Sequence, residues 1–396
     1  MEIGYNKLDI TPTHPVRIAG YNRKEKSKGQ LDPIEINSIF IKNNDKYIVI
    51  SLLDSIIIED SVIQPVKKKL KDEYGLKEEN IILGCIHSHS APAYFKPFFE
   101  DVQIEEKLQK LLIDQFCTSI MNAHSSLKEL DINITQTSID GLYGNRNVKD
   151  AYSNKDLTIL EFKDNGEILH SLLFIATHPT ILNGSNLYLS ADLIGFIRKK
   201  YLEKFSNPCM IANGCCGDVS TRFYRESSGK DELERVSNEI IKQMNHLHKL
   251  NYSINTLKTS TVVEEYTYHG NDEFITSELT NLANKDDAAS KMLYKNLKLK
   301  KERSPMTLKL TSHIIVLGDV IIVTLPGDIT SPLGKMIKDA FPDYLVLTIG
   351  YCENYSNYFV CEEDYGKYFE SYISRLEKGN ADKFVNSIIN ETKRLL

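Results

Sequence analysis

Apolar runs rich in β-forming residues alternate with amphipathic stretches along the first third of the chain. The apolar runs lie at 38–42, 47–54 and 80–86, and stretches with helical spacing lie at about 58–74 and 103–126. Strands that alternate with helices are typical of a mixed α/β fold. We therefore predict an α/β protein with a mixed β-sheet core flanked by helices, and we expect its chemistry where strands end.

The middle of the chain repeats this layout without a detectable sequence repeat. The pattern predicts a strand hairpin at 157–162 and 168–176, a helix near 192–205, a short strand at 209–212 and a helix near 230–249. A second unit of strands and helices is therefore expected.

The last third begins with a predicted strand pair, from about residue 253 to 268. A polar stretch at about 270–304 is predicted to be a peripheral helical excursion, after which the strands resume. A strand at 344–350, a tyrosine-rich loop at 351–372 and a closing helix at 381–395 complete the pattern. Because no Pro-, Ser- or Gly-rich linker divides the chain, a single domain over residues 1–396 is expected.

Composition restricts the classes of function. The 396 residues are 41% hydrophobic, and acidic and basic residues are interspersed to a net charge of −6, which argues against a nucleic-acid surface. No stretch approaches the ~18–20 uninterrupted apolar residues of a membrane span, and the start lacks an apolar signal region, so we expect a cytoplasmic protein. The seven scattered cysteines, without a C-x-x-C pair, favour a reducing compartment. The oligomeric state stays open, a homo-oligomer included.

Four apolar runs end abruptly in polar or glycine-containing residues. They are IILGCIHSHSAP, LLFIATHPTILNG, CMIANGCCGDVSTR and VIIVTLPGDITS. Strand ends at one edge of an α/β sheet converge, so residues distant in sequence can form one site. The candidates at these ends are His87, His89, His178, Asn213, Asp218, Ser220 and Asp328.

The histidines among these candidates suggest a metal site. Residues two apart on an extended strand point to the same face, so His87 and His89 can face one ion while His178 arrives from a neighbouring strand. Asp328 could add a carboxylate. Zinc takes three or four N, O or S ligands, and a catalytic zinc keeps one position for water. The alternative interpretation is a set of satisfied polar residues in turns.

Two further segments carry candidate chemistry. Arg146 lies in an Asn-rich loop, where it could donate to a substrate carbonyl or a developing oxyanion, or simply be an exposed arginine. Residues 350–372 hold six tyrosines, which could form an aromatic lid or an interface, or direct phenol hydroxyls into a site.

The order and spacing of seven motifs resemble those of the catalytic domain of the neutral/alkaline non-lysosomal ceramidase family. The resemblance extends from about residue 4 to 372, and each motif is weak by itself. In chain order the segments are GYNKLDITP with IAGYNR, HSHSAP, NRNVKDAY, ATHPT, NGCCGDVS, LPGDITS and ENYSNYFVCEEDY.

The resemblance implies a ceramidase catalytic-domain-like fold and a zinc cofactor. It implies His87, His178 and Asp328 as metal ligands, with Tyr358 as the last protein ligand and Tyr355 as its alternate. His89 and Arg146 match polar residues around the scissile amide. Ser220 matches a serine that competes with a zinc-bound water for the role of nucleophile. Gly20, Tyr21, Asn213 and Asp218 are expected on the substrate side, where Asp218 orients a ligand or holds its turn.

Three departures from the family pattern concern the substrate more than the reaction type. Asp328 stands where the family has glutamate, Thr221 where it has proline, and Glu353 where it has asparagine. Relatives that cleave ceramide outside the cell carry a secretion signal and a C-terminal immunoglobulin-like domain, and we expect neither in this chain.

The leading hypothesis is hydrolysis of an N-acyl amide, ceramidase-like, by a zinc-activated water. His89 is then expected to protonate the leaving amine, with Arg146 or a tyrosine hydroxyl at the oxyanion. The substrate is an N-acylated lipid such as a sphingolipid, or a small N-acyl or O-acyl compound. The rivals are covalent catalysis by Ser220 and a metal-stabilised binding protein without activity.

Overall fold

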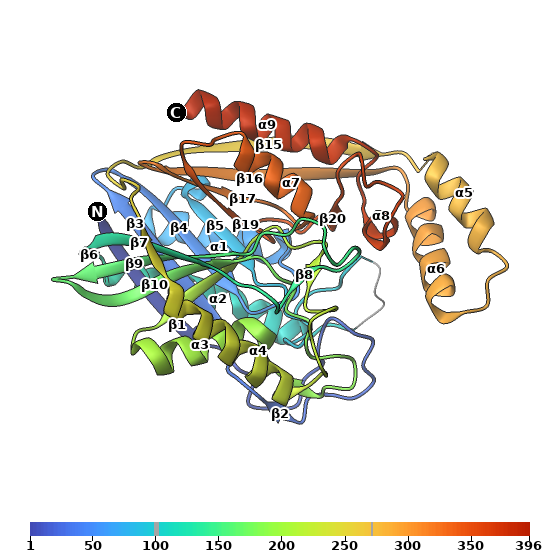
Figure 1. Cartoon of the computed structure of the whole chain (residues 1–396), viewed down its shortest axis with the longest axis horizontal. Helices are drawn as coiled ribbons and strands as arrows, with labels where there is room; N and C mark the ends of the chain where they lie inside the picture. Colours follow the sequence, from blue (N-terminus) through green and yellow to red (C-terminus); the bar gives the residue numbers. More distant parts are fainter. Residues whose placement is uncertain (99–102, 271) are drawn as a thin grey trace.

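The predicted strands pair into mixed sheets that helices cover from outside, as the computed structural model shows for residues 1–98, 103–270 and 272–396 (Figure 1). The α/β prediction is confirmed. The apolar runs of the first third form a sheet of order β5-β4-β3-β1-β6, in which only β4 and β5 are parallel. Its strands are β1 (Glu2–Asp9), β3 (Glu35–Asn43), β4 (Lys46–Leu53), β5 (Ile81–Cys85) and β6 (Lys128–Glu129).

The second sheet has the order β12-β10-β9-β7-β14, and its one parallel pair is β10 with β12. Its strands are β7 (Asp131–Ser138), β9 (Asp156–Asp164), β10 (Glu167–Ile175), β12 (Cys209–Asn213) and β14 (His248–Leu250). The helix predicted near 230–249 ends earlier, at Gln243. A short 3-10 turn η2 (Met244–His246) follows, and β14 then pairs with β7. This pairing satisfies N–H and C=O groups at the edge of β7, which another helical turn would leave unpaired.

The third sheet has the order β15-β16-β17-β19, with β17 and β19 parallel. Its strands are β15 (Lys258–Tyr268), β16 (Met306–Leu317), β17 (Val320–Thr324) and β19 (Leu345–Ile349). The strand pair predicted at 253–268 is a single long strand, because β15 finds its partner in β16 across the helical stretch. Helices α5 (Glu273–Leu282) and α6 (Ala288–Glu302) fill that stretch and project from the end of the β15–β16 hairpin (Figure 1).

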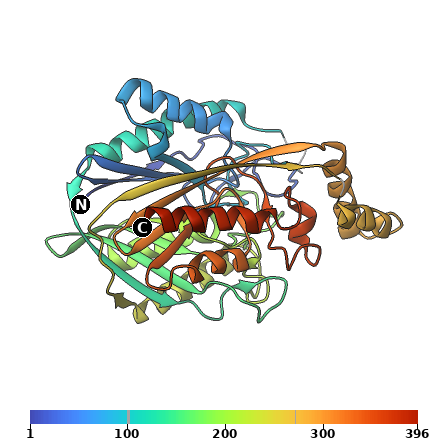
Figure 2. The ribbon, with the colours of Figure 1, turned by 90° about the horizontal axis from the view of Figure 1, so that it is seen from above.

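Helices cover the outer faces of the sheets. The two helices on the first sheet lie on the opposite side of the molecule from those on the second, as Figure 2 shows. They are α1 (Asp60–Tyr74) and α2 (Glu106–Ser125) on the first sheet, α3 (Asp192–Phe205) and α4 (Lys230–Gln243) on the second, and α7 (Ser331–Asp339) and α9 (Asn380–Leu395) on the third. No described helix is long and apolar enough to cross a membrane.

Short elements complete the described chain. They are β2 (Gly29–Gln30) with β11 (Tyr188–Leu189), β8 (Gly144–Asn145) with β13 (Val219–Ser220), β18 (Asp328–Ile329) with β20 (Tyr358–Phe359), η1 (Glu78–Asn80) and α8 (Phe369–Ile373).

A shared apolar core lies between the three sheets. Alternate residues of the strands point to opposite faces. In β3, Ile39 and Ile41 therefore enter the shared core, while Phe40 packs under the helices. Leu172 of the second sheet and Ile322 of the third belong to the same shared core. Each of these fully buried side chains contributes about 1.5–3 kcal/mol relative to exposure.

The parallel pair in each sheet brings strand carboxyl ends to one place. Main-chain hydrogen bonds tie these ends together across the sheets. They run from Cys85 N to Tyr351 O (3.1 Å), from Gly214 N to Ile175 O (2.7 Å) and from Gly350 N to Asn213 O (2.8 Å). Residues that follow four strands, namely β5, β10, β12 and β19, therefore lie close together.

A buried ion triad holds the loop after β19. Lys67 Nζ of α1 lies 2.8 Å from Glu353 Oε1, and His313 Nε2 of β16 lies 3.2 Å from the same oxygen. Glu353 is almost fully buried, and its φ of 56° lies in the left-handed region. A non-glycine residue adopts that conformation only when its surroundings impose it. The triad therefore fixes the path of the loop that carries Tyr351 and Tyr355.

Lys67→Met is expected to lower the free energy of unfolding by about 3–5 kcal/mol, because it leaves the Glu353 charge buried without its main partner. Urea denaturation measures this. The matched control is Lys68→Met on the same helix, where the exposed pair with Asp72 contributes about 0–1 kcal/mol. Equal losses in the two variants would contradict a structural role for the triad.

Candidate metal centre

Three histidines cluster at the converging strand ends, where His87 and His178 are buried and His89 is half-buried. His87 and His89 follow β5, and His178 follows β10. Their ligand-type nitrogens all lie within 4.8 Å of one another. His87 Nε2 and His89 Nε2 are 3.2 Å apart. The structure thus brings together three histidines, the first and last of which are 91 positions apart in the sequence.

Hydrogen bonds to main-chain carbonyls set the orientation of each imidazole. The Nδ1 atoms of His87, His89 and His178 lie 2.6, 3.1 and 2.7 Å from carbonyl oxygens of Ile56, Gly20 and Cys216. A carbonyl only accepts, so each Nδ1 carries the proton and donates, and each Nε2 of the neutral ring is left with its lone pair. Three lone pairs therefore face one another, which is unfavourable unless a cation or proton lies between them.

Burial keeps His87 and His89 in the neutral form that binds metals. It lowers the pKa of His87 to about 4 and holds the pKa of His89 well below its ordinary value, since a charged imidazole loses its hydration there. Neutral imidazole is the form that ligates metals.

Asp328 faces the cluster from β18 and is fully buried. Its Oδ1 lies 3.2 Å from His178 Nε2 and 3.5 Å from His87 Nε2. Burial alone would raise the pKa of the carboxyl, but the positive charge that the two histidines carry when protonated and the hydroxyl of Tyr355 more than offset this and hold the pKa below its usual value. An ionised carboxylate is thus directed at the histidine nitrogens.

Tyrosines from the loop after β19 surround the carboxylate. Tyr351 donates to Asp328 Oδ1 over 2.8 Å and stacks on the His87 ring at 4.4 Å, and Tyr355 donates to Asp328 Oδ2. The Tyr358 hydroxyl lies 3.4 Å from His178 Nε2. Sequence reasoning missed Tyr351, although it follows a strand end as the other candidates do.

These atoms fit the dimensions of a tetrahedral metal site. Ligands bound to zinc at about 2.0–2.1 Å in a tetrahedron are about 3.3 Å apart. The ligand atoms of His178 and Asp328, of His87 and Asp328, and of His178 and Tyr358 are 3.2, 3.5 and 3.4 Å apart. Three of the six separations among His87, His178, Asp328 and Tyr358 thus match a tetrahedral zinc site, and His89 stands one such separation from His87.

Local backbone conformations place the ligands. His87 has a φ of 68°, a left-handed conformation that turns the chain directly after β5. Gly20 has a φ of 90°, and a Cβ there would lie 2.5 Å from His89 Cα. Gly20 thus gives His89 room and also accepts its Nδ1–H.

Arg146 reaches the same centre from the loop after β8. Its Nη2 lies 3.2 Å from the Tyr358 hydroxyl, and its Nε donates to Glu370 Oε1 of α8 over 2.8 Å. Burial opposes the charge, but Tyr358 and Glu370 raise the pKa of the guanidinium above its ordinary value. Arg146 is a positive charge beside the cluster, and Glu370 is a partner that the sequence analysis did not single out.

Ser220 lies in β13 and lines the same cleft as the histidines. Its Oγ accepts a hydrogen bond from Arg222 N over 3.2 Å. Within the described residues no histidine makes a hydrogen bond with this hydroxyl. The covalent mechanism therefore has no positioned base in this arrangement.

The remaining predicted residues fall into two groups. Tyr21 lies in the cleft, with its ring 5.4 Å from that of His89. Asn213 is fully buried and bonds to the main chain at Thr177 and Ile86. Asp218 binds the backbone and hydroxyl of Ser331 and accepts from Asn145, and burial raises its pKa to about 6. Among the described lining residues of the cleft neither Asn213 nor Asp218 occurs, so their substrate-binding role stays a prediction.

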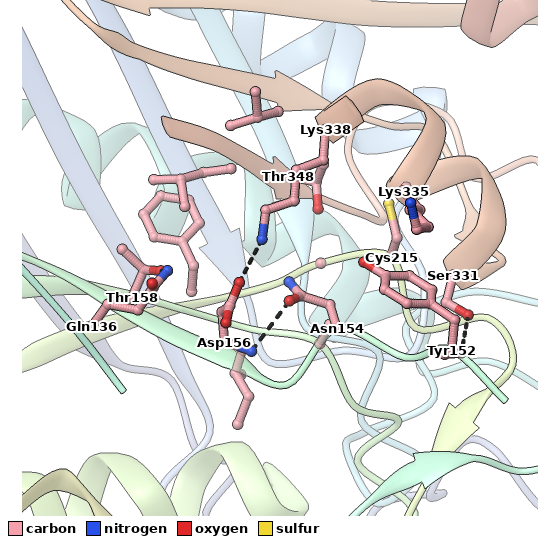
Figure 3. A pocket seen from close by; sticks show the side chains of 17 residues that line it. Gln136, Tyr152, Asn154, Asp156, Thr158, Cys215, Ser331, Lys335, Lys338 and Thr348 are labelled. Atoms are coloured by element: carbon pink, nitrogen blue, oxygen red, sulfur yellow. Dashed lines mark hydrogen bonds and ion pairs between the residues drawn. The ribbon is translucent and has the colours of Figure 1, made fainter. Parts of the chain in front are cut away.

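A cleft of about 350 Å³ opens onto the cluster. Its described lining residues are Tyr21, His89, Arg146, Asn147, His178, Thr180, Ser220, Arg222, Arg225, Tyr358 and Phe369. The cavity of Figure 3 is different: it lies between the second and third sheets, where Lys338 pairs with Asp156 and Ser331 bonds to Tyr152 O. Its volume of about 30 Å³ suits about two water molecules, and none of the three histidines lines it.

The fold and this centre define a mixed α/β protein with a histidine and carboxylate cluster at strand ends. The similarity of the chain to known proteins agrees with this description. Residues 1–207 match the family described as neutral/alkaline non-lysosomal ceramidase, N-terminal. The chain belongs to this family, which confirms the resemblance seen in the sequence.

Relatives of known name show how far the likeness extends. Neutral ceramidase B of Dictyostelium discoideum is 24% identical over 249 residues, which cover 54% of this chain and 33% of that protein. The chain thus matches about a third of the length of this curated relative. The crystal structure of neutral ceramidase from Pseudomonas aeruginosa superposes with a TM-score of 0.78 at 17% identity, over 100% of this chain and 75% of that one. A ceramidase complexed with C2 gives 0.77 at 16% identity over the same shares. At these identities the structures establish the fold.

Gly20→Ala is expected to displace His89 and to lower the free energy of unfolding by more than the about 1–2 kcal/mol that a left-handed alanine costs. Imidazole ¹⁵N NMR of histidine-labelled protein would show His89 shifted, and urea denaturation gives the stability. Gly141→Ala is the matched control, because its φ is 72° but a Cβ meets nothing within 4 Å. Unchanged His89 signals in folded Gly20→Ala would contradict the positioning role of Gly20.

Proposed function

We propose that the chain is a zinc-dependent hydrolase that cleaves an N-acyl amide bond. The observation that carries the proposal is the convergence of neutral imidazole nitrogens and an ionised carboxylate at separations that suit one tetrahedral ion. Membership of the ceramidase family supports amide bonds as the target. Ceramide or a related sphingolipid is one substrate that this family suggests, and a small N-acyl compound is the other.

The proposed ligands are His87, His178, Asp328 and Tyr358. Asp328 is one methylene shorter than the glutamate expected from the family, and the β18–β20 pairing, with Asp328 opposite Tyr358, places its carboxylate at the histidines. When bound there, zinc supplies a Lewis acid that polarises a carbonyl and lowers the pKa of water toward ~7.

The surrounding residues would perform the proton transfer and charge stabilisation. His89 presents an unprotonated Nε2 at the cleft, because its Nδ1 donates to Gly20. It can take a proton at Nε2 and deliver it to the leaving nitrogen, which must be protonated before the amide breaks. The Arg146 guanidinium, held by Glu370, can donate to the oxygen that becomes negatively charged.

His89 as a third histidine ligand is a second interpretation, favoured by its 3.2 Å separation from His87 Nε2. The two interpretations share His87 and His178 and differ in what His89 does. The cytoplasmic location, a homo-oligomer and the single-domain organisation remain predictions. The seven cysteines are all buried and free, which is compatible with a reducing compartment.

Elemental analysis of protein purified without a metal-affinity tag is expected to find about one zinc per chain. His87→Ala and His178→Ala should lose it, because each removes a ligand. His246→Ala, a histidine of η2 outside the cluster, is the matched control and should keep the metal. Absence of metal from the unaltered protein would sink the proposal, and a stoichiometric manganese or iron would correct only the identity of the ion.

His89→Gln separates the two interpretations of His89. As a proton carrier it should leave about one metal per chain and lower kcat on an N-acyl amide by roughly 10²–10⁴-fold. As a ligand it should lower the metal content itself. Elemental analysis and kcat on the same preparation decide between them.

Ser220→Ala is expected to retain kcat within about tenfold, because the serine lacks a positioned base. Turnover of a short chromogenic N-acyl amide measures it. Complete loss of turnover with the metal content unchanged would instead favour the covalent mechanism, and mass spectrometry would then detect an acylated Ser220 in the unaltered protein.

A further inference from the structure

The wall of the cleft carries positive charge without matching negative charge. Three arginines line it, namely Arg146, Arg222 and Arg225, and no aspartate or glutamate is among its described lining residues. The chain as a whole has a net charge of −6, so this local excess of positive charge opposes the overall charge. A cleft with walls of one sign concentrates ligands of the opposite sign.

The three arginines differ in how their charges are balanced. Arg146 is paired with Glu370 at 2.8 Å. Arg225 donates from Nη1 to the carbonyl of Thr180 over 3.0 Å, and the Arg222 guanidinium lies 5.7 Å from the Phe223 ring. Neither contact neutralises a charge, and in the described part of the chain neither Arg222 nor Arg225 forms an ion pair.

One buried acidic residue interacts with Arg225 without forming an ion pair with it. Asp192 lies close enough to Arg225 for the two charges to interact. Its side chain is fully buried, however, and accepts hydrogen bonds from the main-chain N–H groups of Ile181, Leu182 and Leu193. The Asp192 carboxylate is therefore committed to the backbone, and the guanidinium of Arg225 stays exposed.

A fixed turn after β13 presents the two unpaired arginines. The main-chain N–H groups of Tyr224 and Arg225 both donate to Thr221 O over 2.8 Å, and Arg222 N donates to Ser220 Oγ. Thr221 is fully buried. The turn thus begins directly after Ser220, which lines the cleft, and carries two arginines that line the same cleft.

The other lining residues do not suit two long alkyl chains. The cleft has three aromatic residues, Tyr21, Tyr358 and Phe369, and no aliphatic side chain among its described lining residues. Ceramide is uncharged, so its hydroxyl and carbonyl oxygens can accept hydrogen bonds from a guanidinium but cannot balance its charge. Arginine is instead suited to carboxylate and phosphate groups, which it binds through two parallel hydrogen bonds.

We infer that the substrate is an anionic N-acyl compound, whose carboxylate or phosphate group binds Arg222 and Arg225 while its amide lies at the histidine cluster. This inference rests on the proposed function and narrows its substrate class. Arg222 and Arg225 are then specificity residues, outside the metal ligands and the groups that move protons.

The test compares substrates that share one short acyl chain and differ in charge. They are N-acylglycine, which carries a carboxylate, N-acyl-phosphoethanolamine, which carries a phosphate, and neutral N-acylethanolamine. The expected result is a kcat/KM at least about tenfold higher for one or both anionic compounds, falling as salt shortens the Debye length from ~30 Å at 0.01 M to ~8 Å at 0.15 M. The anionic compound with the higher kcat/KM shows whether the arginines bind a carboxylate or a phosphate.

The variant Arg222→Gln/Arg225→Gln should remove this preference, so that kcat/KM on the anionic compounds no longer exceeds kcat/KM on the neutral one. Arg394→Gln is the matched control, since it removes an exposed arginine of α9. Equal kcat/KM for charged and neutral compounds, or a preference that survives in the double variant, would overturn the inference while the hydrolase proposal stands.

Binding provides a readout that does not need turnover. If no compound is cleaved, the hydrolase proposal fails for this substrate class, and calorimetric titration of the same three compounds into the purified chain and the double variant decides the inference. Binding of an anionic compound at least about tenfold tighter than the neutral one, lost in the double variant, supports it. Binding without dependence on the two arginines overturns it. Circular dichroism establishes that each variant is folded.

Discussion

The hydrogen bond from each site imidazole to a main-chain carbonyl is the constraint on which this centre depends. By fixing the proton on Nδ1 it leaves the Nε2 atoms of His87, His89 and His178 with lone pairs directed at one another. Three such nitrogens and the Asp328 carboxylate are an unstable neighbourhood without a cation. The carbonyls belong to three separate segments, so the loops around the site are shaped to orient imidazoles before any ligand arrives.

The fold supplies those segments through an unusual convergence of three sheets. Each sheet has one parallel pair among mostly antiparallel strands, and the carboxyl ends of the pairs are tied together by main-chain hydrogen bonds. Residues after these ends therefore inherit the rigidity of the core between the sheets. The buried triad of Glu353, Lys67 and His313 extends that rigidity to the tyrosine-rich loop, so that Tyr351 and Tyr355 can hold the Asp328 carboxylate. Glu353 thus holds the path of this loop through its contacts with Lys67 and His313.

The histidine cluster and the wall of the cleft have different chemical roles. In the proposed function, the cluster of histidines, Asp328 and Tyr358 concerns how a bond is activated, and its three histidines lie within the residues that match the family. The wall with Arg222 and Arg225 concerns what is bound, and it lies on a turn that begins immediately after Ser220. Loops change more freely than the strands that position them. A change in the charge of such a wall can therefore alter which acyl compound binds, while the fold and the histidine cluster stay the same.

The sequence by itself determined the strands, most helices and the main site residues, because these depend on local signals. Runs such as 47–54 and 80–86 are strands in any context that buries them, and an abrupt change from apolar to polar residues marks a strand end whatever the topology. His87, His178 and Asp328 could therefore be singled out, and the motif order identified the family. Only the tertiary structure decided which carbonyl orients each ring, that Tyr351 and Glu370 join the centre, and that Asn213 and Asp218 are bound to the backbone away from the cleft lining. It also decided that residues 248–250 form a strand and that Arg222 and Arg225 share a wall with the histidines. These features depend on contacts between residues far apart in the chain, and periodicity carries no information about which distant partners a side chain meets.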